Sequence, residues 1–228
     1  MSLKPEQFRI AGIDEAGRGP MFGPMVVCGV LVDLDSLDFL TRSGVKDSKA
    51  LSAKRREEFA KTIRKVATKI VVEKVSAIQI DTSRHRGTNL NETEVNVFAS
   101  IAKKLNPTEL YLDAADVKSN RFGENIRRKS GLSAKKCKIV SEHKADSKYV
   151  VVSAASIIAK TERDAIINKL HEEYGDFGSG YPTDPKSTAF LKKMIEKREE
   201  LPFFVRRSWK SVSKAIQEGK SVQKRLNH

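Results

Sequence analysis

Two adjacent carboxylates, Asp14 and Glu15, stand directly before a glycine-rich turn, Gly17-Arg18-Gly19. They end an apolar run over residues 8–13 that is typical of a buried strand. Neighbouring residues of a strand point to opposite faces, so the two carboxylates can share a ligand only where the strand gives way to a loop. Carboxylate oxygens bind hard divalent cations. The glycines of the turn allow backbone conformations and close ligand approaches that a side chain would block, and Arg18 offers a planar cation to a phosphate. The segment predicts a metal site for phosphoryl chemistry, although an ordinary solvated turn would use the same residues.

Two more carboxylates follow the same arrangement further along the chain. Residues 109–113 (ELYLD) alternate like a strand and end on Asp113, and Asp146 lies just before a helical pattern over residues 148–174. In open α/β sheets, ligands bind outside the carboxyl ends of the strands, so all four carboxylates are expected to converge there. Asp116 is an alternative third carboxylate. We prefer Asp113 because Asp113 directly ends the strand. Four carboxylates without a neighbouring histidine or cysteine favour Mg²⁺ or Mn²⁺ over zinc.

Apolar patterns predict the strands that would carry these acids. Residues 25–32 (MVVCGVLV) form a nearly continuous apolar run, which is typical of a strand buried on both faces. The short link from the first strand makes this run its antiparallel partner. Two further strands are expected at residues 69–75 and 139–140. Together with the strand at residues 109–113, they indicate a mixed sheet with helices between the strands.

Capping residues predict where two of the helices begin. Ser52 is a good N-cap for a helix with apolar residues at helical spacing. Residues 81–91 are polar and are expected to form a loop, after which Asn91 and Glu94 resemble a capping box for the next helix. Lys49, in the loop before Ser52, could reach a phosphate, although an isolated loop lysine is more often only solvated.

The net charge of the 228-residue chain is +14, and two stretches carry it. Residues 117–138 hold eight lysines and arginines against one acid, and residues 186–228 hold twelve against four. The rest of the chain is close to neutral. This distribution is typical of a polyanion binder, and nucleic acid is favoured over a membrane because neither stretch is a continuous amphipathic helix. Charge runs are also often only solvated faces.

The sequence disfavours several other classes of protein. No apolar run reaches the length of a bilayer span and no signal-peptide pattern opens the chain, so we expect a cytoplasmic protein without membrane association. The two cysteines, Cys28 and Cys137, lack metal-ligand spacing and cannot form a disulfide framework, which fits a reducing setting. The chain has no Walker A loop, no G-x-S-x-G elbow and no dinucleotide-binding fingerprint.

The motifs, taken together and in order, resemble those of a known enzyme family. They are Asp14-Glu15-Ala16-Gly17-Arg18-Gly19-Pro20, Asp47-Ser48-Lys49, Leu112-Asp113, Lys144-Ala145-Asp146, Ser153-Ala154-Ala155-Ser156-Ile157 with Arg163-Asp164, and Gly180-Tyr181-Pro182-Thr183. As a set they resemble ribonuclease HII, the type 2 ribonuclease H, and most closely its archaeal branch. The resemblance covers about residues 10–185, and the tail beyond Ser187 resembles the family only as a basic helical extension.

The resemblance implies an α/β ribonuclease H-like fold, a mixed five-stranded sheet flanked by helices, with a C-terminal helical extension. We expect a catalytic domain over residues 1–186 and a basic helical extension over residues 187–228. The implied enzyme is an endoribonuclease that hydrolyses the RNA strand of RNA/DNA hybrids and cuts DNA duplexes on the 5′ side of an embedded ribonucleotide. Divalent metal ions, Mn²⁺ or Mg²⁺, would assist the hydrolysis, which leaves 3′-hydroxyl and 5′-phosphate ends.

The functional residues of the family carry over by position. The implied catalytic and metal-binding set consists of Asp14, Glu15, Asp113 and Asp146. The implied substrate-binding set consists of Gly17, Arg18, Gly19, Lys49 and Tyr181. The glycine-rich turn would contact the 2′-hydroxyl and the flanking phosphates, and Tyr181 would pack on the deoxyribose that follows. We expect a monomer that needs no membrane, with a replication clamp as a candidate partner.

Two other functions remain as alternatives. A non-catalytic RNA-binding protein would explain the basic stretches but not four acids near strand ends, and it predicts no metal dependence. A ribonuclease H-like DNA nuclease would share the acids. The glycine-rich turn and Tyr181 disfavour such a nuclease, because these groups serve a ribose-to-deoxyribose junction.

Overall fold

The computed structural model describes residues 8–45, 51–197 and 199–226. The chain falls into two compact units. Unit 1 consists of Met1–Ala16, Val26–Lys74 and Asn91–Glu162, and unit 2 consists of Gly17–Met25, Val75–Leu90 and Arg163–His228. The long helix α7, Val150–Tyr174, contributes its first half to unit 1 and its second half to unit 2.

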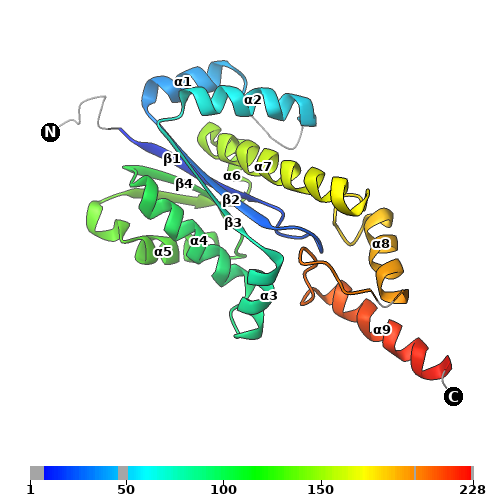
Figure 1. The fold of residues 1–228 in the computed structure, drawn as a ribbon. Coiled ribbons are helices and arrows are strands. Elements are labelled where there is room, and N and C mark those ends of the chain that lie inside the picture. The colour runs from blue at the N-terminus through cyan, green and yellow to red at the C-terminus, as the bar shows by residue number, and fades with distance from the viewer. Residues whose placement is uncertain (1–7, 46–50, 198, 227–228) are drawn as a thin grey trace. The chain divides into compact units, whose positions relative to one another are not determined.

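Unit 1 is built on a five-stranded sheet with the strand order β3-β2-β1-β4-β5 (Figure 1). The strands are β1 (Ile10–Ala16), β2 (Met25–Val32), β3 (Lys69–Val75), β4 (Glu109–Asp113) and β5 (Lys138–Glu142). β1 runs antiparallel to β2 and parallel to β4, and β4 is parallel to β5. The predicted mixed five-stranded sheet is therefore confirmed, as is its antiparallel first pair.

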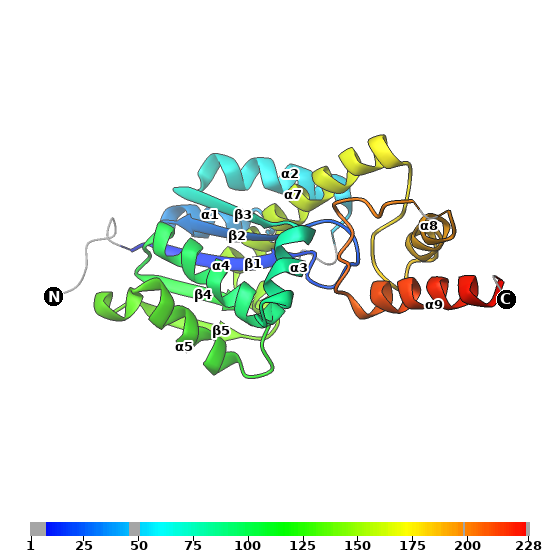
Figure 2. The ribbon, with the colours of Figure 1, turned by 60° about the horizontal axis from the view of Figure 1, so that its bottom comes forward.

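Helices cover both faces of the sheet in unit 1. On one face lie α1 (Leu34–Arg42), α2 (Ala53–Val66) and the first half of α7, and on the other lie α4 (Leu90–Leu105) and α5 (Ser119–Ser130) (Figures 1 and 2). A Cβ on Gly12 would lie 2.4 Å from backbone atoms of Val151, so α7 begins directly against β1. On the opposite face, a Cβ on Gly29 would lie 2.4 Å from Ile101 of α4. The two glycines let both helices approach the middle of the sheet closely.

The predicted start of α2 is confirmed, but the predicted loop that follows β3 is wrong in part. The Ser52 side chain accepts a hydrogen bond of 3.3 Å from the backbone N–H of Arg55, as an N-cap does. Residues 81–85 belong to α3 (Ala77–His85) rather than to a loop. A capping box between Ser76 and Gln79 starts this helix before the polar stretch, which then continues it.

The predicted capping box of Asn91 and Glu94 is also wrong. Helix α4 already begins at Leu90, so Asn91 lies inside the helix. The Glu94 side chain is fully buried, and its charge acts on Glu15. The packing of α4 against the sheet takes this carboxylate into the interior of unit 1, away from the end of the helix.

Unit 2 consists largely of helices around an aromatic core. Its helices are α3, the second half of α7, α8 (Pro185–Glu196) and α9 (Lys210–Leu226). Phe22, Phe177 and Phe204 are buried, with ring centroids 5.5 Å, 5.9 Å and 5.2 Å apart in the three pairs. Phe22 also forms an isolated β-bridge with Val205. The loop that follows β1 is therefore bound to the segment that precedes α9.

The described part of the chain contains no helix long and apolar enough to span a bilayer. Its two cysteines, Cys28 and Cys137, are buried free thiols. Burial raises the pKa of both thiols, that of Cys137 to about 11. Neither cysteine is therefore a reactive thiolate at neutral pH.

Candidate active site

Strand register brings Asp14 and Asp113 together. In the parallel pair of β1 and β4, Ile13 lies opposite Leu112, so the next residue on each strand is one of the two aspartates. Asp14 is buried and Asp113 is half-buried. The two carboxylates thus meet at the carboxyl end of adjacent parallel strands, where α/β sheets bind their ligands.

Asp146 reaches the same place from a different element. It lies in the short helix α6 (Ala145–Lys148), which follows Lys144 in a left-handed conformation with φ of 56°. The backbone N–H of Ala145 donates a hydrogen bond of 3.0 Å to Asp113 Oδ1, which ties α6 to the end of β4. Ligand oxygens of Asp14, Asp113 and Asp146 all lie within 4.8 Å of one another. The structure therefore brings three of the four predicted carboxylates together.

Glu15 lies next to Asp14, but it is not one of the three aspartates whose ligand oxygens converge. The strand does not end at the two acids, because β1 continues to Ala16 and pairs Glu15 with Val27 of β2. The alternation of side chains directs Glu15 to the opposite side of the strand from Asp14, but the negative charge of Asp113 still raises its pKa, so Glu15 stays near the three-aspartate group. It remains hydrogen-bonded to the Asp14 side chain and close to the charge of Glu94.

The aspartate group is electrostatically strained without a cation. Burial raises the pKa of Asp14 from 3.8 to about 6, the negative charge of Asp113 adds to this, and hydrogen bonds from Ser156 and from the Glu15 backbone oppose it. Burial and the charges of Asp14 and Glu94 hold the pKa of Glu15 well above its usual range. A bound cation would relieve this repulsion.

Ser156 and Lys160 belong to this site, although the sequence analysis named Ser156 only as part of a motif and did not name Lys160. Lys160 Nζ donates a hydrogen bond of 2.9 Å to Ser156 Oγ, and Ser156 hydrogen-bonds to Asp14. Both residues lie on α7 four positions apart, so they share one face of the helix. A serine and a lysine at this spacing, in the apolar first half of the helix, were the available signal.

The Asp116 side chain pairs with Arg121 and does not join the three-aspartate group. Its carboxylate accepts hydrogen bonds from Arg121 Nε at 3.0 Å and Arg121 Nη2 at 2.6 Å, and from the backbone N–H of Lys118 at 3.1 Å. The bonds from Arg121 hold the pKa of Asp116 below its usual range. The structure thus places Asp113, and not Asp116, beside Asp14.

The predicted substrate-binding residues that the structure describes lie in unit 2. Gly17 has φ of +78°, and a Cβ there would lie 2.3 Å from Arg163 Nε, so the backbone and the space both require glycine. A Cβ on Gly19 would lie 3.3 Å from Tyr181 Cε1, so the turn and the tyrosine ring are neighbours. Arg18 is half-buried between the two glycines. The prediction for Lys49 lies outside the described residues.

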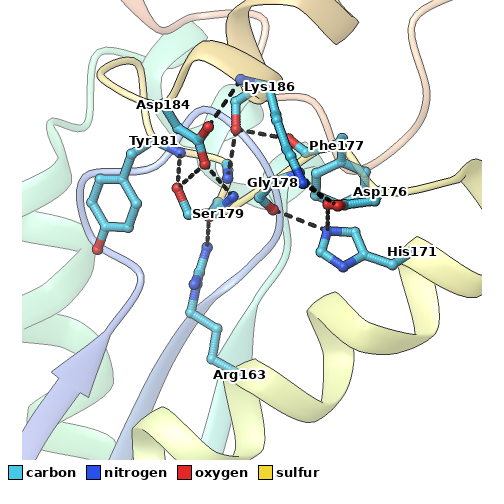
Figure 3. Close-up of polar contacts among 11 residues, drawn as sticks. Arg163, His171, Asp176, Phe177, Gly178, Ser179, Tyr181, Asp184 and Lys186 are labelled. Carbon is cyan, nitrogen blue, oxygen red and sulfur yellow. Dashed lines mark hydrogen bonds and ion pairs between the residues drawn. The ribbon is translucent and has the colours of Figure 1, made fainter. Parts of the chain in front are cut away.

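A hydrogen-bonded loop between α7 and α8 presents Tyr181 (Figure 3). The Asp184 carboxylate accepts bonds from Ser179 N at 2.6 Å and Ser179 Oγ at 2.7 Å, and the bond from the Ser179 backbone is the main cause that lowers the pKa of Asp184 to about 2. His171 Nε2 lies 2.9 Å from the carbonyl oxygen of Gly178. Tyr181 is 40% exposed, and its hydroxyl points away from these bonds.

A comparison of the sequence with models of protein families shows to which family the chain belongs. The model described as Ribonuclease HII matches residues 11–212. The chain belongs to the ribonuclease HII family. It is 48% identical to the ribonuclease HII of Methanocella arvoryzae over 213 residues, which cover 91% of each chain.

Solved structures of ribonuclease HII relatives share the fold. The ribonuclease H2 of Pyrococcus horikoshii OT3 matches with a TM-score of 0.86 and 37% identity, over 93% of this chain and 99% of that one. The structure of the PCNA:RNase HII complex from Archaeoglobus fulgidus matches with a TM-score of 0.82 and 44% identity, over 90% and 96% of the chains. The chain therefore has the ribonuclease H-like fold and is a hydrolase of the ribonuclease H family.

The three-aspartate group fits the divalent-metal dependence of the ribonuclease HII family. Within the described ranges, the group contains carboxylate oxygens and no histidine or cysteine ligand. Oxygen-only donor sets suit hard cations such as Mg²⁺ and Mn²⁺. Burial and the negative charge of Asp113 raise the pKa of Asp14, and a bound cation would offset the repulsion between the two carboxylates.

The protein without metal should lose stability as the pH rises from about 4 to about 6. The pKa of Asp14 rises from 3.8 to about 6 in the folded chain, so the folded state binds more protons in this window than the unfolded state does. The loss is on the order of 3 kcal/mol once the carboxyl is ionised in both states. Glu15 shifts in the same direction and adds to the effect. Calorimetric Tm values in EDTA across this pH range check the result.

Asp14→Asn provides the control for this pH effect. The amide cannot ionise, so the variant should show a flatter decline of Tm with pH and a higher Tm than the wild type near pH 7. The same decline in both proteins would contradict the assignment of the stability loss to Asp14.

Proposed function

We propose that the protein hydrolyses the RNA strand of RNA/DNA hybrids and cuts DNA duplexes on the 5′ side of an embedded ribonucleotide, leaving 3′-hydroxyl and 5′-phosphate ends. The observation that carries this function is the convergence of Asp14, Asp113 and Asp146 within 4.8 Å, in a chain that matches the ribonuclease HII family over residues 11–212. A binding protein would have no use for three buried or half-buried carboxylates whose mutual repulsion destabilises the fold.

We assign the cation-binding role to the three aspartates, with Mg²⁺ or Mn²⁺ as the ion. When bound, such an ion polarises the scissile phosphate and lowers the pKa of the attacking water. Asp113 is oriented by the Ala145 N–H, and Asp14 is oriented by Ser156 and by the Glu15 N–H. Glu15 completes the acidic set from its place beside Asp14.

Substrate selection is assigned to the glycine-rich turn and Tyr181. The turn residues Gly17, Arg18 and Gly19 would contact the 2′-hydroxyl and the flanking phosphates, and the exposed ring of Tyr181 would pack on the following deoxyribose. The close approach of Gly19 to the Tyr181 ring supports this assignment of the turn and the tyrosine to one substrate site. Lys49 is proposed as a further substrate-binding residue on its sequence motif alone.

The domain division, oligomeric state, location and protein partner are further parts of this proposal. We propose a catalytic domain over residues 1–186, with residues 187–228 as a basic extension that favours polyanion binding. We also propose that the protein acts as a monomer in the cytoplasm. A replication clamp is a candidate partner, supported by the Archaeoglobus fulgidus relative whose structure was solved as a PCNA complex.

Cleavage of three end-labelled duplexes tests the function. The duplexes carry zero, one or four consecutive ribonucleotides, and each is incubated with Mn²⁺, Mg²⁺ or EDTA before a denaturing gel. We expect cleavage of the second and third duplexes on the 5′ side of a ribonucleotide, only with metal. Cleavage of the all-DNA duplex would indicate the DNA nuclease instead, and binding without cleavage would indicate an RNA-binding protein.

A further inference from the structure

Two side chains from the segment between α8 and α9 bind the carbonyl groups of the glycine-rich turn. The Arg206 guanidinium donates hydrogen bonds of 2.5 Å to the Gly17 oxygen and 2.9 Å to the Arg18 oxygen. The indole Nε1 of Trp209 donates a hydrogen bond of 3.0 Å to the Gly19 oxygen. Three consecutive carbonyl groups of the turn are therefore bound by donors from one segment of unit 2.

These contacts determine where the N–H groups of the turn point. In a trans peptide group the C=O and N–H bonds point in opposite directions, and the described residues contain no cis peptide. The N–H groups of Arg18 and Gly19 belong to the two peptide groups whose oxygens Arg206 binds. Both N–H groups therefore point away from Arg206. Successive N–H groups on one side of a turn form a concave donor site for an anion or a hydroxyl oxygen.

Arg206 is itself tightly held. Its side chain is fully buried, and Nε donates a third hydrogen bond of 3.0 Å to the Gly23 oxygen at the other end of the loop. Its Cζ lies 4.8 Å from the centroid of the Trp209 ring, a distance suited to a cation–π contact. Burial lowers the pKa of Arg206 to about 9, so the guanidinium keeps its positive charge at neutral pH. This charge lies against the carbonyl side of the turn, where it favours an anionic ligand on the other side.

Asp81 of α3 fixes the segment that carries both side chains. Its carboxylate accepts hydrogen bonds from the backbone N–H of Arg207 at 2.8 Å, from the backbone N–H of Ser208 at 3.0 Å and from Ser208 Oγ at 2.5 Å. The backbone between Arg206 and Trp209 is thus anchored independently of the turn. The two donors are therefore preorganised for the carbonyl groups that they bind.

We propose that Arg206 and Trp209 are positioning residues that fix the N–H groups of Arg18 and Gly19 toward the ribonucleotide at the cleavage site. This inference rests on the proposed function and adds the residues that give the turn its orientation. The recognised chemistry is the 2′-hydroxyl and adjoining phosphate of a ribonucleotide. Neither side chain touches the substrate.

Trp209→Phe tests the proposal with little disturbance of the fold. The phenyl ring can keep its contact with Arg206, but the donor to the Gly19 oxygen is lost. On a DNA duplex with one ribonucleotide, we expect kcat to fall about fivefold, because one orienting hydrogen bond is removed. KM should change less than twofold, because many cation–phosphate contacts set the affinity for the duplex. Arg206→Lys, which replaces a planar fork with one ammonium group, should lower kcat more than tenfold.

A matched control separates positioning from general destabilisation. Ile216→Ala shortens a side chain of α9 that packs on the aromatic core of unit 2 and makes no hydrogen bond to the turn. It should lower the Tm at least as much as Trp209→Phe while kcat stays near the wild-type value. Mn²⁺ affinity, measured by titration calorimetry, should be the same in all four proteins, because the aspartates lie in unit 1.

The outcomes separate this inference from the proposed function. Wild-type cleavage together with unchanged kcat in Trp209→Phe and Arg206→Lys would overturn the positioning role alone. An equal loss of kcat in Ile216→Ala would overturn it too, because stability would then explain the effect. Wild-type protein that cuts no ribonucleotide-containing duplex with metal would overturn the proposed function and the inference together.

Discussion

Asp113→Asn should lower kcat on a ribonucleotide-containing duplex by at least about a thousandfold while the fold stays intact. The asparagine Oδ1 can still accept the hydrogen bond from the Ala145 N–H, so α6 and Asp146 keep their places. What the substitution removes is one negative charge from the three-aspartate group, and with it much of the attraction for a divalent cation. Because the charge of Asp113 raises the pKa of Asp14, the apo variant should be at least as stable as the wild type.

Single-turnover cleavage at saturating Mg²⁺, with a Tm measurement in EDTA, checks this result. Asp116→Asn is the matched control, since it removes a nearby carboxylate that pairs with Arg121 instead of joining the group. Its activity should stay within a fewfold of the wild type. A large loss in Asp116→Asn, with near-normal turnover in Asp113→Asn, would reverse the assignment of the two aspartates.

Tyr181→Ala should lower cleavage at a single embedded ribonucleotide by about a hundredfold, because misplacing the substrate by about 1 Å has effects of that size. The ring lies next to Gly19, and Arg163 Cζ lies 5.9 Å from its centroid. In the proposed role of the ring, its removal would leave the sugar after the cleaved bond without a surface to pack on. The Asp184 and His171 contacts that shape the loop do not involve the ring, so the loop should keep its conformation (Figure 3).

Tyr181→Phe distinguishes the ring from its hydroxyl. The hydroxyl points away from the hydrogen bonds of the loop, so the phenylalanine variant should keep most of the activity. Cleavage rates of the duplex with one ribonucleotide, measured for both variants, check this. Equal large losses would show that the hydroxyl matters, and full activity in Tyr181→Ala would remove Tyr181 from the substrate site.

Much of the fold of unit 1 could be predicted from the sequence because its signals are local. The apolar run at residues 25–32 became β2, which is buried along its whole length, and the alternation at 109–113 became β4. The acid near the end of each apolar run predicted the meeting of Asp14 and Asp113, which the parallel register of β1 and β4 brings about. The fold family followed from the order of these motifs.

Only the tertiary structure decided how the remaining groups are used. The choice between Asp113 and Asp116 depended on Arg121, and the direction of the Glu15 side chain depended on the pairing of β1 with β2. Glu94, which the sequence suggested for a cap, is buried because α4 packs on the sheet. Sequence patterns report the periodicity of one segment, whereas these outcomes depend on a second segment. The contact of Arg206 with Gly17 joins residues 189 positions apart, and no local pattern encodes such a bond.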